Sequence, residues 1–89
     1  MYAISSTQML TAKANPNAFK DGIVIERGFG FVTLKLFSGE SIKLRLFESP
    51  ADSQFFSLFE PVAFHPDAEV IAAGNNWMSV TLLENVLSN

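Results

Sequence analysis

Residues Arg27-Gly28-Phe29-Gly30-Phe31-Val32-Thr33-Leu34 place two aromatic rings two positions apart, with a glycine before each ring. Side chains at positions i and i+2 of a strand point to the same face, so Phe29 and Phe31 are expected on one surface. The glycines let the backbone turn tightly and let a ligand approach closely. The stretch therefore predicts a β-strand that presents aromatic rings on one face.

The same eight residues match an octapeptide that reads single-stranded RNA, Lys/Arg-Gly-Phe/Tyr-Gly/Ala-Phe-Val-x-Phe/Tyr, at every specified position except the last. Leu34 occupies that last position, where the motif has an aromatic residue. In such motifs the rings stack on nucleic-acid bases. The pattern favours a binding face and carries no information about which base sequence is bound.

A β-hairpin is expected around the turn Ser38-Gly39-Glu40, because residues 31–37 and 41–47 both alternate between apolar and other side chains. One face is apolar and is expected in the core: Val32, Leu34, Leu36, Ile42, Leu44 and Leu46. The other face carries Phe29, Phe31, Thr33, Lys35, Phe37, Lys43, Arg45 and Phe47. Four of the six basic residues lie on or just before these strands, counting Arg27, so a basic stripe accompanies the rings.

Shorter patterns predict the remaining elements. Strands are expected at 23–25, at 62–64 or 70–73, and at 77–83. Ser49 and Pro50 are typical of a helix start, and this short helix is expected to run to about Leu58. Residues 1–20 are predicted to be an N-terminal extension, either an extra strand or an ordered arm, and residues 21–89 form the main domain.

Composition narrows the class of protein. The chain has 89 residues, of which 48% are apolar and 17% charged, which is typical of one folded domain. A net charge of −3 argues against broad electrostatic binding to duplex DNA. Cysteine is absent, which excludes disulfides, thiolate zinc sites and cysteine nucleophiles. The sequence has no apolar run of membrane-spanning length and no signal-peptide pattern, so a cytoplasmic protein without a membrane partner is expected.

Taken together, these segments resemble a diverged cold-shock domain. Gly22-Ile23-Val24 resembles that family's first strand, and residues 27–32 resemble its Lys-Gly-Phe-Gly-Phe-Ile segment. Residues 55–60, Phe-Phe-Ser-Leu-Phe-Glu, resemble its Phe-x-Ser-Leu-x-Glu, and Glu84-Asn85-Val86 resembles its closing segment. The resemblance implies an all-β fold, a small five-stranded barrel of the oligonucleotide-binding (OB) type, with one short helix and the N-terminal extension.

The motif and the resemblance lead to one candidate site, which would bind single-stranded RNA or DNA. Phe29, Phe31 and Phe47 are expected to stack on bases, and the resemblance implies that Phe55 covers the same face. The residues expected to contact phosphates or bases are Arg27, Lys35, Lys43 and Arg45. No catalytic group, metal or cofactor is expected. His65 is the only histidine and is interpreted as a loop residue, and the scattered carboxylates form no pair for acid–base chemistry.

A second hypothesis keeps the barrel and replaces nucleic-acid binding with protein interaction or assembly. The acidic net charge, the nine Phe residues and the absence of the family's Trp-Phe-Asn segment favour it. Under this hypothesis residues 1–14 of the same chain or of a second subunit pair with a sheet edge and cover the aromatic face. A homodimer through that face or through the N-terminal segment is also left open.

Residues 55–59 have the spacing of a buried helix face, and Trp77 is expected to anchor the core.

Overall fold

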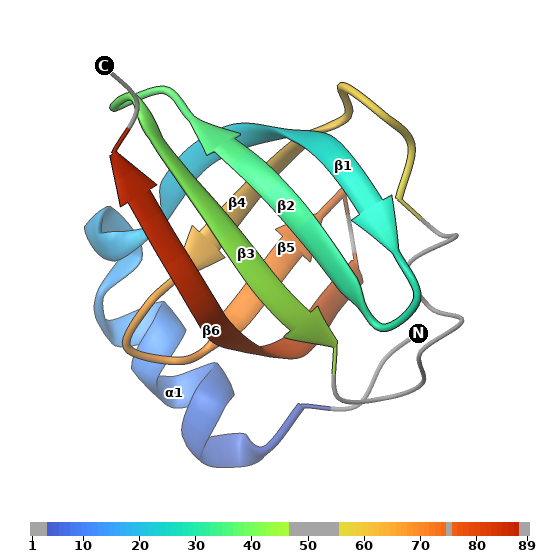
Figure 1. Cartoon of the computed structure of the whole chain (residues 1–89). Helices are drawn as coiled ribbons and strands as arrows, with labels where there is room; N and C mark the ends of the chain where they lie inside the picture. The colour runs from blue at the N-terminus through green and yellow to red at the C-terminus, as the bar shows by residue number, and fades with distance from the viewer. Residues whose placement is uncertain (1–3, 47–55, 75, 88–89) are drawn as a thin grey trace.

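The computed structural model describes residues 4–46, 56–74 and 76–87. These residues form α1 (Ser6–Ala14), the 3-10 turn η1 (Pro16–Ala18) and six strands, β1 (Lys20–Gly28), β2 (Phe31–Leu36), β3 (Glu40–Leu46), β4 (Pro61–His65), β5 (Val70–Ala73) and β6 (Asn76–Leu87). The strands close into a barrel in the order β1-β2-β3-β6-β5-β4 (Figure 1). Each neighbouring pair is antiparallel. A small, closed all-β barrel is therefore confirmed, and the short helix that accompanies it in the described residues is α1.

The number of strands differs from the sequence-based prediction. The prediction of five was wrong, because both segments considered for the fourth strand form strands in the described part of the chain. They are β4 and β5, which pair with each other from Ala63–Ala72 to His65–Val70. The long strand β6 pairs with β5 through its first residues and with β3 through the rest. Because β6 pairs with both β3 and β5, the barrel stays closed with six strands.

The hairpin core is confirmed. All six side chains predicted to point inward from β2 and β3 are buried. They pack with residues from every other strand and from the segment before β4: Val24, Phe56, Val62, Phe64, Ile71, Met78 and Val80. Side chains fill the interior of a barrel of this size. A ligand must therefore bind on the outside of the barrel or at one of its ends.

The N-terminal segment forms a helix, so the extra-strand alternative was wrong for residues 6–14. Ser5 and Gln8 form a capping box: the Ser5 hydroxyl accepts from the Gln8 backbone N–H, and the Gln8 side chain accepts from the Ser5 backbone N–H. The Gln8 amide also donates to the hydroxyl of Ser79 at 2.7 Å. Ala12 is buried in a small second cluster with Ala68 and Val70. These contacts hold α1 on the outside of β5 and β6.

This position of α1 contradicts the expectation that the N-terminal segment covers the aromatic face of its own chain, whereas coverage by a second subunit stays a prediction. The helix lies beside β6 at the lower left of Figure 1, whereas the β1–β2 turn lies at the right. Phe29, in that turn, remains 83% exposed. No helix of the described residues is long and apolar enough to cross a membrane.

His65 is a buried structural residue rather than a loop residue. It ends β4 and is 0% exposed. Its Nδ1 accepts from the Ala68 backbone N–H at 3.1 Å, so Nε2 carries the proton and donates to the Asn15 carbonyl at 3.0 Å. Phe19 packs edge-on against the imidazole and against Trp77, which is half-buried outside the main core. His65 therefore joins the end of α1 to the β4–β5 turn.

The short helix predicted between Ser49 and about Leu58 is not present in the described part of that range. Phe56, Ser57 and Leu58 are not helical, and residues 49–55 lie outside the described residues. Phe56 is buried, as expected of a core residue, whereas Leu58 and Phe59 are exposed. The helical spacing was misleading because the backbone turns at Ser57–Glu60, where the Glu60 N–H donates to the Ser57 carbonyl.

Replacing His65 with Ala is expected to lower the free energy of unfolding by about 2–4 kcal/mol, because the change removes two hydrogen bonds and leaves a cavity. Urea unfolding followed by circular dichroism measures the loss. Gln8→Ala is the control, since it removes partly exposed hydrogen bonds and is expected to cost about 1 kcal/mol. A His65→Ala loss no larger than that of the control would contradict the bridging role.

Candidate nucleic-acid interface

The β1–β2 turn carries the most exposed aromatic ring among the described residues. Gly28 pairs with Phe31 across the two strands, which leaves Phe29 and Gly30 as the two turn residues. Gly30 has a φ of 89°, a conformation that glycine adopts without steric cost. The second glycine of the motif therefore forms the turn. Phe29 sits at its tip and projects into solvent instead of sharing a strand with Phe31.

Phe31 is half-buried and packs within the sheet surface. Its ring lies over Gly28, since a Cβ added at Gly28 would overlap the ring atoms of Phe31. The Lys43 Nζ lies 4.1 Å from the ring centroid, within the range of a cation–π interaction. The first glycine of the motif thus makes room for Phe31. A base can reach the ring only where the Lys43 side chain moves aside.

The strand register brings two cations next to Phe31, on the strands that adjoin the turn of Phe29. Arg45 lies opposite Phe31, and Thr81 of β6 lies opposite Arg45. In the next row Lys43 lies opposite Thr33, whose hydroxyl donates to the Glu26 carboxylate at 3.1 Å. Arg45 is exposed to solvent, whereas Lys43 is half-buried against Phe31. We call Phe29, Phe31, Lys43 and Arg45 the tip face.

The other two predicted cations have different contacts. Arg27 donates from its guanidinium to the Phe56 carbonyl at 2.6 Å and so joins the end of β1 to the segment before β4. Lys35 lies about 13 Å along β2 from Phe31, and its Nζ donates to the Gly39 carbonyl in the next turn. The four predicted cations therefore do not form one stripe. Of these four, only Lys43 and Arg45 lie next to Phe31.

The remaining predicted site residues, Phe47 and Phe55, lie outside the described residues. Sequence reasoning missed two polar neighbours of the tip face, Glu26 and Thr81. Thr81 is placed beside Arg45 by long-range strand pairing, and Glu26 is placed beside Thr33 by the β1–β2 hairpin, whose register shifts at a bulge. A local pattern carries no signal for these neighbours.

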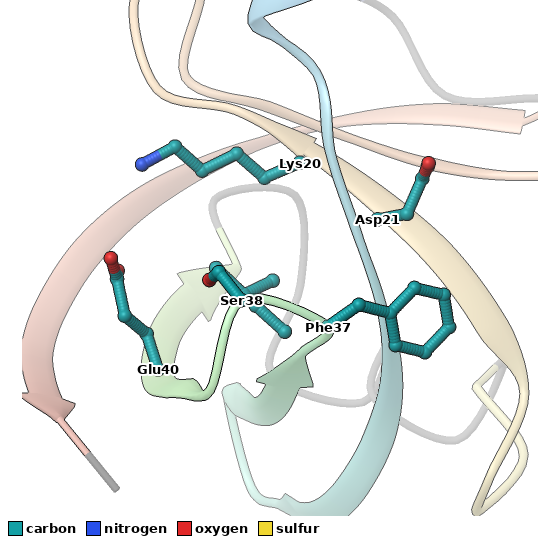
Figure 2. A pocket seen from close by; sticks show the side chains of 6 residues that line it. Lys20, Asp21, Phe37, Ser38 and Glu40 are labelled. Atoms are coloured by element: carbon teal, nitrogen blue, oxygen red, sulfur yellow. The ribbon is translucent and has the colours of Figure 1, made fainter.

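A shallow pocket of about 290 Å³ lies at the opposite end of the hairpin, lined by Lys20, Asp21, Leu36, Phe37, Ser38 and Glu40. Lys20 and Glu40 flank one side of the opening, and Asp21 and Phe37 lie on the other (Figure 2). The charges of both signs favour neither an anion nor a cation. Phe37 is 74% exposed in the β2–β3 turn and is a counterpart to Phe29 at the other end of β2.

Comparison of the chain with protein-family models, with curated proteins and with solved structures finds no match. The resemblance to cold-shock domains therefore rests on the quoted residues alone.

Replacing Gly28 with Ala is expected to displace the Phe31 ring and to destabilise the fold by about 1–3 kcal/mol, the usual cost of overpacking. Urea unfolding measures this cost. The same substitution in a Phe31→Ala background removes the overlap and should cost clearly less. An equal cost in both backgrounds would show that Gly28 is required for another reason.

Proposed function

We propose that this barrel binds a short single-stranded segment of RNA or DNA at the tip face. The observation that carries the proposal is the Phe29 ring, 83% exposed at a tight turn, with the Arg45 and Lys43 cations on the adjoining strand surface. Exposed rings beside cations are the usual elements of sequence-tolerant single-strand binding. The closed antiparallel barrel is consistent with an OB-like fold, which supports the same reading.

Each group would have a distinct role. A base stacks on the free face of Phe29, since stacking needs only a flat exposed ring. The guanidinium of Arg45 contacts a phosphate next to that base through charge-assisted hydrogen bonds. Phe31 positions Lys43, whose ammonium contacts a second phosphate. A site with one exposed ring and two cations is expected to have low affinity and little base specificity.

The alternative is a barrel that binds proteins and no nucleic acid. The net charge of −3 and the exposed side chains of Leu58 and Phe59 away from the tip face favour it. Under this alternative, oligonucleotides fail to bind even at low salt, where electrostatic attraction is strongest. Titrating the chain with an oligonucleotide at low salt therefore distinguishes the two functions.

Phe29→Ala is expected to weaken the binding of oligo-dT or oligo-U by about 5- to 150-fold, since a stacked base is worth roughly 1–3 kcal/mol. Fluorescence titration at low salt measures the affinity. Phe37→Ala is the matched control, because it removes a similarly exposed ring from the opposite turn and should leave binding unchanged. Equal effects of both variants, or no binding by the wild type at tens of micromolar protein, would rule out the site.

The dependence of affinity on salt is expected to be shallow. Each phosphate neutralised on a single strand contributes roughly −0.7 to the slope of log affinity against log salt concentration. If only Lys43 and Arg45 neutralise phosphates, the slope is therefore about −1.4. Stacking on Phe29 keeps a residual affinity at high salt. A slope near −3 would instead mean that Arg27 and Lys35 also contact phosphates and leave their present hydrogen bonds.

A further inference from the structure

The turn before β4 holds an aromatic residue in a conformation that usually requires glycine. Phe59 has a φ of 67°, in the left-handed region. The Glu60 N–H donates to the Ser57 carbonyl at 3.1 Å, so Leu58 and Phe59 are the central residues of a β-turn. A turn with positive φ at its second central position favours glycine or asparagine. A bulky side chain at this position strains the backbone.

The pairing of this turn with β1 gives a second, independent reason to expect glycine. The Phe59 N–H donates to the Val24 carbonyl at 2.6 Å, and the Val24 N–H donates to the Glu60 carbonyl at 3.1 Å. Two residues thus oppose one, which defines a β-bulge whose first residue is left-handed and is commonly glycine. Three other described positions of positive φ, at residues 30, 39 and 74, are glycines; Glu69 is the other exception.

Packing does not compensate for the strain at Phe59. Its side chain is 69% exposed, and that of the adjacent Leu58 is 49% exposed. A ring that contributes little to the core and strains its own backbone destabilises the isolated fold. Strain of this kind is a reason to look for a function at the strained residue.

The neighbouring strand extends the apolar surface. The Phe59–Val24 hydrogen bond places the turn directly beside β1, at the start of the β1 bulge between Val24 and Glu26. At that bulge both Ile25 and Glu26 are exposed, although neighbouring residues of a regular strand point to opposite faces. We call Ile25, Leu58 and Phe59 the Phe59 patch.

Two carboxylates flank the Phe59 patch and are held in place. The Glu60 carboxylate accepts from the Ser57 backbone N–H at 2.8 Å, and the Glu26 carboxylate accepts from the Thr33 hydroxyl. The nearby Arg27 guanidinium donates to the Phe56 carbonyl of its own chain. An apolar centre between fixed carboxylates is complementary to an apolar side chain that has Lys or Arg beside it.

We propose that the Phe59 patch docks a segment of another protein in which apolar and basic residues alternate. Phe59 forms the centre of the contact, in keeping with the enrichment of aromatic residues at the core of protein interfaces. Glu26 and Glu60 favour a partner that carries basic residues. The proposal does not depend on the function of the tip face, because it uses none of the tip-face residues. The small area of the patch makes this a weak, transient contact.

The test uses a fluorescein-labelled peptide of about eight residues in which Leu and Lys alternate, followed by fluorescence anisotropy against the full chain. Phe59→Gly is expected to reduce its affinity by about tenfold or more while leaving the melting temperature unchanged or raising it by about 4–8 °C. Phe59→Asn, which also tolerates the left-handed conformation, should act in the same way. Glu60→Gln keeps the oxygen that accepts from Ser57 and should weaken binding at low salt only.

Matched controls separate this surface from the tip face. Phe29→Ala should leave peptide binding unchanged, and Phe59→Gly should leave oligo-dT binding unchanged. Peptides in which Ser and Lys or Leu and Glu alternate should not bind. The proposal is overturned if the wild type fails to bind the Leu–Lys peptide at about 1 mM, or if Phe59→Gly binds it as tightly. It is also overturned if the Ser–Lys peptide binds equally well, or if Phe59→Gly instead abolishes self-association of the chain.

Discussion

The double pairing of β1 is the constraint on which the rest of the structure depends. Residues from Gly22 to Gly28 pair with β2, while Lys20 to Ile23 pair with β4, so one strand closes the barrel. A Cβ added at Gly22 would meet the Lys35 carbonyl, which shows how closely the strands approach at this point. After Ile23 the strand leaves β4 and continues with β2 into the turn that holds Phe29. Closure therefore determines where the tip face lies.

The same strand places the two candidate surfaces in different electrostatic settings. At its end, Gly28 makes room for the Phe31 ring, which in turn supports Lys43 beside Arg45. At the start of its bulge, Val24 is hydrogen-bonded to Phe59 and Glu60, and the next two residues along the strand, Ile25 and Glu26, are exposed. One surface combines rings with cations and the other combines apolar side chains with carboxylates. A chain of net charge −3 can thus present a local basic site without being basic overall.

Local patterns predicted the parts of the fold that depend on neighbouring residues. The period-two alternation of the β2–β3 hairpin identified all six of its buried residues, since a one-residue shift in register would expose them. The number of strands was missed because β4 and β5 are short, with only five and four residues. The Ser5–Gln8 capping box is a sequence signal for a helix start, and the prediction of an extra strand or an arm overlooked it. What holds that helix in place is contact with Ala68 and Ser79, more than 50 residues away.

The candidate site was only partly predictable for the same reason. The motif and the alternation of the hairpin identified the residues of the tip face, but the positions of Arg27 and Lys35 depend on the carbonyls of Phe56 and Gly39, which neither pattern indicates. The sequence also could not predict which Phe rings are exposed. Phe29, Phe31 and Phe59 are the same residue type, and their exposure depends on their surroundings in the fold. The strain at Phe59 has no sequence signal apart from the absence of glycine in a turn.

The most direct test of single-strand binding at the tip face is a chemical-shift map of the ¹⁵N-labelled chain titrated with oligo-dT. The account predicts that the backbone amides of residues 28–31 and 43–45 shift together, while those of Lys20, Asp21 and Phe37 at the opposite end of the hairpin stay in place. Shifts centred on α1, on β5 or on the pocket of Figure 2, or no shifts at all, would contradict it.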